Sequence, residues 1–264
     1  MNILPIGILD SGIGGLTVAK EIVRLLPNEN IIYLGDTARV PYGSRGREVI
    51  CSFAKDLVSF LLDKKVKCII VACNTISATC LTDLQSLVPV PLLGVIDPSV
   101  EAIVKTTKNK RVGVIGTKAT INSNKYTDAI NDLDSTIAVI TKACPMFVPL
   151  AEEGLAESDA ALLLARGYLS ELKGIDTLHL GCTHYPLLRR TIQKVIGDDV
   201  TIIDSAIPAA YALHDLLSEK LLINKSVEEP ERKFYVTDLS ATVYDIATNF
   251  FGFDITPYIS EVGI

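Results

Sequence analysis

The stretch from Lys67 to Thr79, KCIIVACNTISAT, constrains the fold of this chain more than any other. It begins with apolar and β-branched residues, which predict a strand buried on both faces of a parallel sheet. The strand ends at Cys73-Asn74-Thr75, and small residues suited to a helix follow. Open parallel sheets bind ligands at the carboxyl ends of their strands, and a helix N-terminus favours a thiolate over a thiol. The stretch therefore predicts an activated cysteine at the ligand-binding edge of a sheet.

The same pattern occurs a second time in the chain. The segment DTLHLGCTHY contains a short apolar strand that ends in Cys182-Thr183, and Cys182 lies 109 positions after Cys73 (182 − 73). The start of the chain gives another match, because IGILDS (6–11) is similar to VGVIGT (112–117) at an offset of 106 (117 − 11). Two offsets this close predict two copies of one α/β unit that face each other, each supplying a cysteine from the end of an equivalent strand.

Predicted strands and helices alternate along the whole chain, which is typical of an α/β protein with parallel sheets. The second copy begins near residue 110 and is complete by about residue 204, so the remaining residues are expected to return to the first lobe. We predict two facing lobes related by pseudo-symmetry, each a parallel-type sheet flanked by helices, with the active site in the cleft between them. Lobe one is expected to comprise 1–96 and 206–264, and lobe two 97–205.

Size and charge narrow the classes of function. A chain of 264 residues can build two modest domains with real cores. Its net charge of −6 argues against a nucleic-acid partner. No stretch reaches the roughly 18 consecutive apolar residues of a membrane span, and the first residues, MNILPIGILDSG, lack the basic start of a signal peptide. We therefore expect a cytoplasmic protein with no membrane association.

The six cysteines are scattered and include no C-x-x-C pair. Cys51, Cys68 and Cys80 lie in apolar surroundings and are expected to be buried free thiols rather than disulfides, because the cytosol is reducing. A metal site is disfavoured because zinc-type spacing is absent. His179 lies within an apolar strand and is expected to pack there, and His214 is assigned no role.

Two thiols that face each other across a cleft can form a disulfide, bind a metal, or act as acid and base. The third use fits best, because taking a proton from one face of a Cα and returning one to the other face inverts the stereocentre. A partly activated thiol supplies a pKa near the working pH. Asp10 can accept a hydrogen bond from a thiol or from a substrate ammonium group, and His184 can orient or charge-balance the Cys182 side. Hydrogen bonds for carboxylates can come from Ser11, Asn74, Thr75, Thr117, Thr120 and Thr183, for which helix capping is the alternative interpretation.

Four motifs together resemble those of glutamate racemases, a cofactor-independent family that makes D-glutamate for bacterial cell walls. They span residues 10 to 187 in the order of the family and are Asp10-Ser11-Gly12-x-Gly14-Gly15-Leu16, Asp36 followed by Pro41-Tyr42-Gly43, Cys73-Asn74-Thr75, and Gly181-Cys182-Thr183-His184-Tyr185-Pro186-Leu187.

The resemblance implies that Cys73 and Cys182 are the two acid/base thiols, that the substrate is glutamate, and that neither cofactor nor metal takes part. It also implies a two-lobed fold, and a homodimer as in many relatives. The substrate contacts that it implies are Asp10, Ser11, Tyr42, Gly43, Asn74, Thr75, Thr183 and His184. The expected supporting residues are Asp36, Glu152, Thr117 and Thr120.

Three alternatives remain open. Aspartate racemases and other two-cysteine epimerases share the Cys-Asn-Thr and Gly-Cys-Thr motifs, and one methylene of substrate is worth only about 1–3 kcal/mol. A non-catalytic dicarboxylate-binding protein would use the same polar contacts, although it has no need for a thiol on each side. An enzyme dependent on pyridoxal phosphate would need a Schiff-base lysine, and the lysines here lie mostly in charged clusters typical of a solvated surface.

Overall fold

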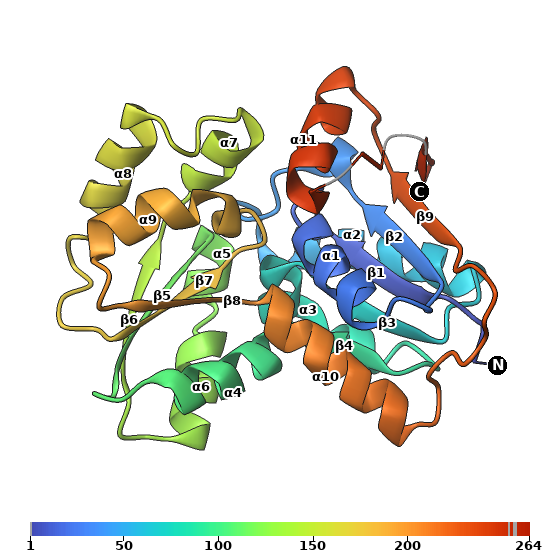
Figure 1. Cartoon of the computed structure of the whole chain (residues 1–264), viewed down its shortest axis with the longest axis horizontal. Coiled ribbons are helices and arrows are strands. Elements are labelled where there is room, and N and C mark those ends of the chain that lie inside the picture. The colour runs from blue at the N-terminus through green and yellow to red at the C-terminus, as the bar shows by residue number, and fades with distance from the viewer. Residues whose placement is uncertain (1, 253, 256–257) are drawn as a thin grey trace.

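Two separate parallel sheets organise the computed structural model, which describes residues 2–252, 254–255 and 258–264 (Figure 1). All strand pairs recorded within these residues are parallel. The strands of the first sheet, in order across it, are β10 (Ile259–Glu261), β9 (Arg232–Val236), β2 (Ile31–Gly35), β1 (Ile6–Asp10), β3 (Cys68–Val71) and β4 (Leu92–Gly94). Those of the second sheet are β6 (Ala138–Ala143), β5 (Arg111–Gly116), β7 (Thr177–Gly181) and β8 (Thr201–Asp204).

Helices connect the strands and cover the sheets. Within the described residues they are α1 (Leu16–Leu25), η1 (Thr37–Arg39), α2 (Arg47–Asp63), α3 (Asn74–Gln85), α4 (Ile96–Thr106), α5 (Lys118–Asn122), α6 (Lys125–Leu133), α7 (Phe147–Glu152), α8 (Asp159–Leu169), η2 (Tyr185–Leu188), α9 (Arg189–Ile196), α10 (Ala206–Glu219) and α11 (Ala241–Phe251), where η marks a 3₁₀ helix. None of these helices is long and apolar enough to cross a membrane.

The internal repeat predicted from the sequence is present as a repeated strand order. In the first sheet β1 lies between β2 and β3, with β4 beyond β3, and in the second sheet β5 lies between β6 and β7, with β8 beyond β7. The matching segments at the start of each copy form β1 and β5, while β3 and β7 lead to Cys73 and Cys182. The predicted fold class is therefore confirmed. Strands β9 and β10, which come from the last 33 residues (264 − 231), extend the first sheet beyond β2.

Burial explains why these segments form central strands. Every residue of β1, β2, β3 and β7 is buried, as expected for parallel strands covered by helices on both faces. Helix α1 buries one face, with Leu16, Val18, Ala19 and Ile22 in the core. Helix α10 contacts both α1 and α4, and α4 contacts β7 and β8, so α10 joins the two halves of the molecule (Figure 1).

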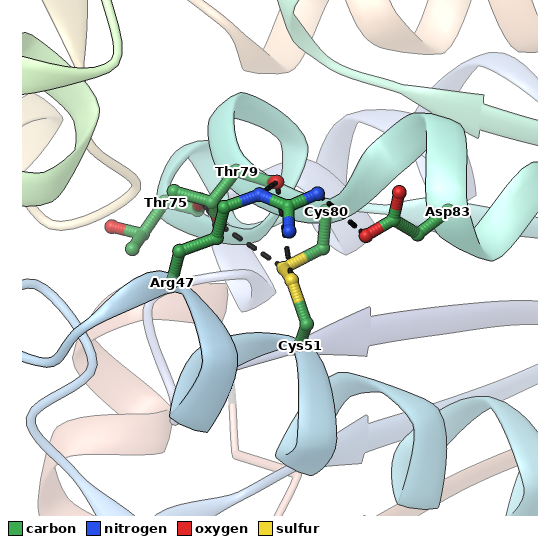
Figure 2. Close-up of a disulfide and its surroundings, with 6 residues drawn as sticks. All are labelled: Arg47, Cys51, Thr75, Thr79, Cys80 and Asp83. Atoms are coloured by element: carbon green, nitrogen blue, oxygen red, sulfur yellow. Dashed lines mark hydrogen bonds and ion pairs between the residues drawn. A yellow bond between two sulfur atoms is a disulfide. The ribbon is translucent and has the colours of Figure 1, made fainter.

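The expectation of free thiols is wrong for Cys51 and Cys80, which form a disulfide between α2 and α3 (Figure 2). Their Cα atoms are 5.4 Å apart because the two helices pack side by side, although the cysteines are 29 positions apart in the chain. Arg47 joins the same two helices by donating from Nε to the carbonyl of Thr79 (3.1 Å). The prediction failed because it relied on the redox state of a compartment, whereas helix packing decides which thiols meet. Cys68 is a buried free thiol, as expected.

Candidate active site

A cavity of about 350 Å³ lies where the carboxyl ends of strands from both sheets meet. This is the edge at which open α/β sheets bind ligands. Eleven of the fourteen residues predicted for the site line this cavity. They are Ser11, Tyr42, Gly43, Cys73, Asn74, Thr75, Thr117, Glu152, Cys182, Thr183 and His184. Asp10, Asp36 and Thr120 are buried behind this lining.

Cys73 occupies the position before the first residue of α3, at the end of β3. Its thiol donates to the hydroxyl of Ser11, with Sγ and Oγ 3.2 Å apart. Burial and the negative charge of Asp10 raise the pKa of Cys73 to about 12, although Ser11 and the amide of Ile76 act in the opposite direction. The start of α3 does favour the Cys73 thiolate, as expected, but the loss of water around the sulfur outweighs this effect, and the pKa of Cys73 is raised rather than lowered.

Asp10 lies beneath the glycine-rich turn at the end of β1 and is fully buried. Its Oδ2 accepts from the amide of Gly12 (3.1 Å). Burial raises the pKa of Asp10 more than the charge of His184 and three backbone amides lower it. Asp10 thus affects Cys73 through its charge, and both groups hold their protons more tightly than in water.

Cys182 has different neighbours, because it follows β7 and is next to a histidine. Its Sγ lies 3.9 Å from Nδ1 of His184, whose Nε2 lies 3.0 Å from a carboxylate oxygen of Glu152. The ring of His184 also packs edge-on against Phe250 of α11, with centroids 5.1 Å apart. Burial by itself would lower the pKa of His184, but Cys182 and Glu152 raise it to about 10. At neutral pH this structure therefore favours an imidazolium beside Cys182.

Tyr42 forms one wall of the cavity and is held from behind by Asp36. Its hydroxyl donates to Oδ2 of Asp36, which also pairs with Arg39, and Oδ1 of the same carboxylate accepts from Thr237 (2.7 Å). Burial and the hydrogen bond to Asp36 raise the pKa of Tyr42 well above its ordinary value. Asp36 therefore positions the tyrosine from outside the lining of the cavity.

Three threonines form a hydroxyl cluster between the two halves. Thr75 and Thr117 lie 2.9 Å apart at their Oγ1 atoms, as do Thr117 and Thr120, and Thr75 lies 3.4 Å from Thr120. Thr117 also accepts from the amide of Thr120 as the N-cap of α5. The capping interpretation and the site interpretation thus both hold for Thr117.

Two glycines allow the halves to approach closely at the cavity. A Cβ added at Gly14 would lie 2.3 Å from Oγ1 of Thr183 and 2.4 Å from Nδ1 of His184. A Cβ added at Gly43 would lie 2.6 Å from the Cβ of Thr117. Any larger residue at either position would force the two halves apart, so these glycines are needed for the width of the cleft.

Sequence reasoning missed several residues of the lining. Lys118 and Ser44 are polar, while an apolar wall is formed by Val40, Pro41, Pro145, Val148 and Pro149. The positions of Lys118 and Ser44 directly after Thr117 and Gly43 could have indicated them. Apolar lining residues carry no signal in a single sequence, because the same residue types fill the core.

Neither of the other two histidines is part of the lining. His179 is fully buried in β7, as expected, and His214 is a half-buried residue of α10 beside Asp215. In the part of the chain that the structure describes, no group of three or more His, Cys, Asp or Glu side chains is arranged to hold a metal ion.

Comparison with known proteins gives a consistent result. Residues 6–213 match the family model described as Asp/Glu/Hydantoin racemase. The chain is 45% identical over 249 residues to the glutamate racemase of Geobacter metallireducens, covering 94% of this chain and 92% of that protein. It is 47% identical over 263 residues to the glutamate racemase of Chlorobaculum tepidum, covering 98% and 96%. The crystal structure of Francisella tularensis glutamate racemase in complex with D-glutamate has a TM-score of 0.94 and 40% identity, covering 100% of this chain and 98% of that chain.

Proposed function

As a member of the Asp/Glu/hydantoin racemase family this chain is an amino-acid racemase, and we propose that it interconverts L- and D-glutamate by moving protons between Cα and two cysteines. Cys73 and Cys182 are the proposed acid and base, and no cofactor is part of the mechanism. The curated relatives named above are glutamate racemases, which supports glutamate over aspartate as the substrate.

The observation that carries the two-cysteine mechanism is that both sulfurs line one cavity and have unequal neighbours. Racemisation needs one group that takes a proton from Cα and one that gives a proton to its opposite face. Burial beside Asp10 raises the pKa of Cys73, so its thiol is the proposed acid in the resting protein. The raised pKa of His184 keeps an imidazolium beside Cys182, which is the proposed base. When the proton has crossed, Cys182 is the acid and Cys73 the base for the reverse reaction.

The remaining lining suits an amino acid with two carboxylates. Hydroxyl donors line the cavity at Ser11, Thr75 and Thr183, and Lys118 adds a positive charge to it. The apolar wall excludes water from the reacting carbon, which strengthens each hydrogen bond to the bound carboxylates. We propose that these groups hold glutamate with its Cα between the two sulfurs.

The test is circular dichroism of L-glutamate incubated with the purified protein, with neither pyridoxal phosphate nor a divalent metal added. The signal should decay to zero, and in D₂O one deuterium should enter Cα of the product. The assay is run with and without a thiol reductant, because the chain contains a disulfide. An unchanged signal with folded protein would contradict the proposal. Decay of L-aspartate alone would favour aspartate racemase, and binding without decay would favour a dicarboxylate-binding protein.

We further propose that the D-glutamate product supplies peptidoglycan synthesis in the cytoplasm. Expression of the chain should restore growth of a bacterial strain that requires external D-glutamate, and the Cys73→Ser variant should not. Growth restored equally by both would contradict this role for the racemase activity.

A further inference from the structure

A buried hydrogen-bond network connects the cavity residue Asn74 to three side chains from other elements. Oδ1 of Asn74 accepts from the hydroxyl of Tyr126 on α6 (2.5 Å) and from the hydroxyl of Ser205, directly before α10 (3.1 Å). Nε2 of His179 on β7 lies 2.9 Å from the Tyr126 oxygen and 3.4 Å from the Ser205 oxygen. All four residues are buried. Only Asn74 reaches the cavity lining.

The directions of these hydrogen bonds follow from counting protons. Each hydroxyl has a single proton, and both protons point to Oδ1 of Asn74. The Tyr126 and Ser205 oxygens therefore act as acceptors toward His179, so Nε2 of His179 must carry the proton between them. Burial lowers the pKa of His179 to about 4, which leaves the ring neutral at pH 7 with one proton to place. Burial also raises the pKa of Tyr126 above its ordinary value, so its hydroxyl stays a donor.

This arrangement leaves the NH₂ group of Asn74 without a hydrogen-bond partner among the described residues. The amide oxygen is fully occupied, and Asn74 is only 2% exposed at the wall of the cavity. A buried amide donor is costly to leave unpaired. Because Asn74 is part of the cavity lining, a carboxylate bound there is the group that can pair with this NH₂.

We propose that Tyr126, Ser205 and His179 are positioning residues that fix the amide of Asn74, so that its NH₂ group donates to a carboxylate of the substrate. This inference rests on the function proposed above for the cavity. The opposite orientation of the network is chemically complete as well. If His179 carried its proton on Nδ1, both hydroxyls would donate to Nε2, and Asn74 would turn its oxygen to the cavity. The tautomer of His179, which is not part of the cavity lining, thus determines whether Asn74 offers a hydrogen-bond donor or an acceptor to the substrate.

The first experiment separates positioning from general support of the fold. Tyr126→Phe keeps the ring and removes one donor to Asn74, so KM for glutamate should rise about threefold to tenfold with a smaller change in kcat. Adding Ser205→Ala should raise KM further, toward the value of Asn74→Ala. In the Asn74→Ala background, Tyr126→Phe should leave KM unchanged, because the residue through which it acts is gone.

Tyr168→Phe is the matched control. Its hydroxyl accepts from the amide of Met146 (3.4 Å) and does not contact Asn74, so this variant should keep the wild-type KM. Urea unfolding of each variant gives its stability separately. A KM increase from Tyr126→Phe that persists in the Asn74→Ala background would overturn the proposal, as would a loss of stability with KM unchanged.

The second experiment tests the orientation of Asn74. Asn74→Asp has nearly the same shape but lacks the NH₂ donor and adds a negative charge, so affinity for D-glutamate by titration calorimetry should fall by about tenfold or more. Unchanged or tighter binding would show that an acceptor faces the substrate, which overturns the proposal. Because calorimetry needs no turnover, the result stands even if the racemase assay fails, and the two failures can be told apart.

Discussion

The surroundings of Cys73 and Cys182 differ although the two cysteines end equivalent strands of repeated sheets. Cys73 meets a serine hydroxyl and a buried aspartate, and its pKa is raised to about 12. Cys182 meets His184, whose pKa is raised to about 10 by Cys182 and by Glu152. The repeat thus places the two sulfurs at equivalent strand ends, while the local side chains give one a hydroxyl and a buried aspartate and the other a histidine paired with a glutamate.

The difference bears on the proposed mechanism, in which one sulfur takes a proton from Cα and the other gives a proton to the opposite face. Unequal neighbours suit this division of roles, because burial and Asp10 raise the pKa of Cys73 whereas Nδ1 of His184 lies 3.9 Å from Sγ of Cys182.

The largest effect is expected from replacing either sulfur. Cys73→Ser and Cys182→Ser should each lower racemisation by roughly a thousandfold or more, because a serine hydroxyl is too weak an acid and base for the step. Each variant keeps one sulfur, which can still exchange the Cα proton of a single enantiomer with solvent. In D₂O, Cys73→Ser and Cys182→Ser should therefore deuterate opposite enantiomers without inverting them, as measured by NMR and chiral chromatography.

The controls for this prediction are Cys68→Ser and Cys144→Ser, which remove buried free thiols outside the cavity lining. They should keep racemisation within about an order of magnitude after correction for folded protein. Deuteration of the same enantiomer by both active-site variants would mean that the two sulfurs do not face opposite sides of Cα.

A smaller effect is expected from the partners of the sulfurs. Glu152→Gln removes the carboxylate that helps hold the imidazolium at His184, and kcat should fall by about tenfold to a hundredfold. Ser11→Ala removes a neutral hydrogen bond to Cys73, and kcat should fall by about threefold to tenfold.

The enantiomers of glutamate have equal free energies in water, so kcat/KM must stay the same in both directions for each variant. Direction-dependent changes are expected in kcat and KM separately, measured from each pure enantiomer.

The order of these two effects can be contradicted by experiment. If Ser11→Ala lowers kcat more than Glu152→Gln does, then proton transfer at Cys73 limits turnover, and the His184–Glu152 pair beside Cys182 contributes less to kcat. Thr191→Val serves as a control, because its hydroxyl bonds only to the carbonyl of Ala156 away from the cavity.

The repeat and the two cysteines were predictable from sequence because they leave short-range signals. A run of β-branched and apolar residues before Cys73, and a short apolar strand before Cys182, predict that both cysteines lie at strand ends. The raised pKa of Cys73 was not predictable, since it depends on how much protein covers the sulfur. His179 was correctly expected to pack within its strand, but its bond to Tyr126 joins residues 53 positions apart. Contacts at that separation, like the disulfide, come from packing that spacing does not encode.

The two sides should also differ in the pH range over which they stabilise the fold. The folded pKa of His184 is raised from 6.5 to about 10, so its contribution is complete below about pH 6.5 and is lost as pH rises to about 10. The folded pKa of Cys73 is raised from 9.0 to about 12, so its contribution is lost only between about pH 9 and 12. The free energy of unfolding in urea should therefore fall in two windows that overlap between about pH 9 and 10.

Two variants show which group causes the fall in each window. His184→Gln should flatten the dependence between pH 6.5 and 9 and leave the range above about pH 10 unchanged, while Cys73→Ser should flatten only the range above pH 9. A slope between pH 6.5 and 9 that survives in His184→Gln would contradict the raised pKa of His184.

The smallest effect on turnover is expected from the disulfide, which marks a further difference between the two sides. Helix α3, which follows Cys73, is linked to α2 by Cys51–Cys80, whereas the described residues around η2, which follows Cys182, include no such link.

Closing a loop of 29 positions should raise the free energy of unfolding by about 3–4 kcal/mol in the chain-entropy account. The double variant Cys51→Ser/Cys80→Ser should lose that stability, yet change KM and kcat by less than about twofold, because neither residue lines the cavity. Because the four free cysteines are buried, alkylation of the urea-unfolded, unreduced protein followed by mass spectrometry should label these four and leave Cys51 and Cys80 unlabelled until a reductant is added. Labelling of all six cysteines before reduction would show that Cys51 and Cys80 are free thiols, as expected from the sequence. Neither α3 nor η2 would then be held by a covalent link, and this difference between the two sides would be absent.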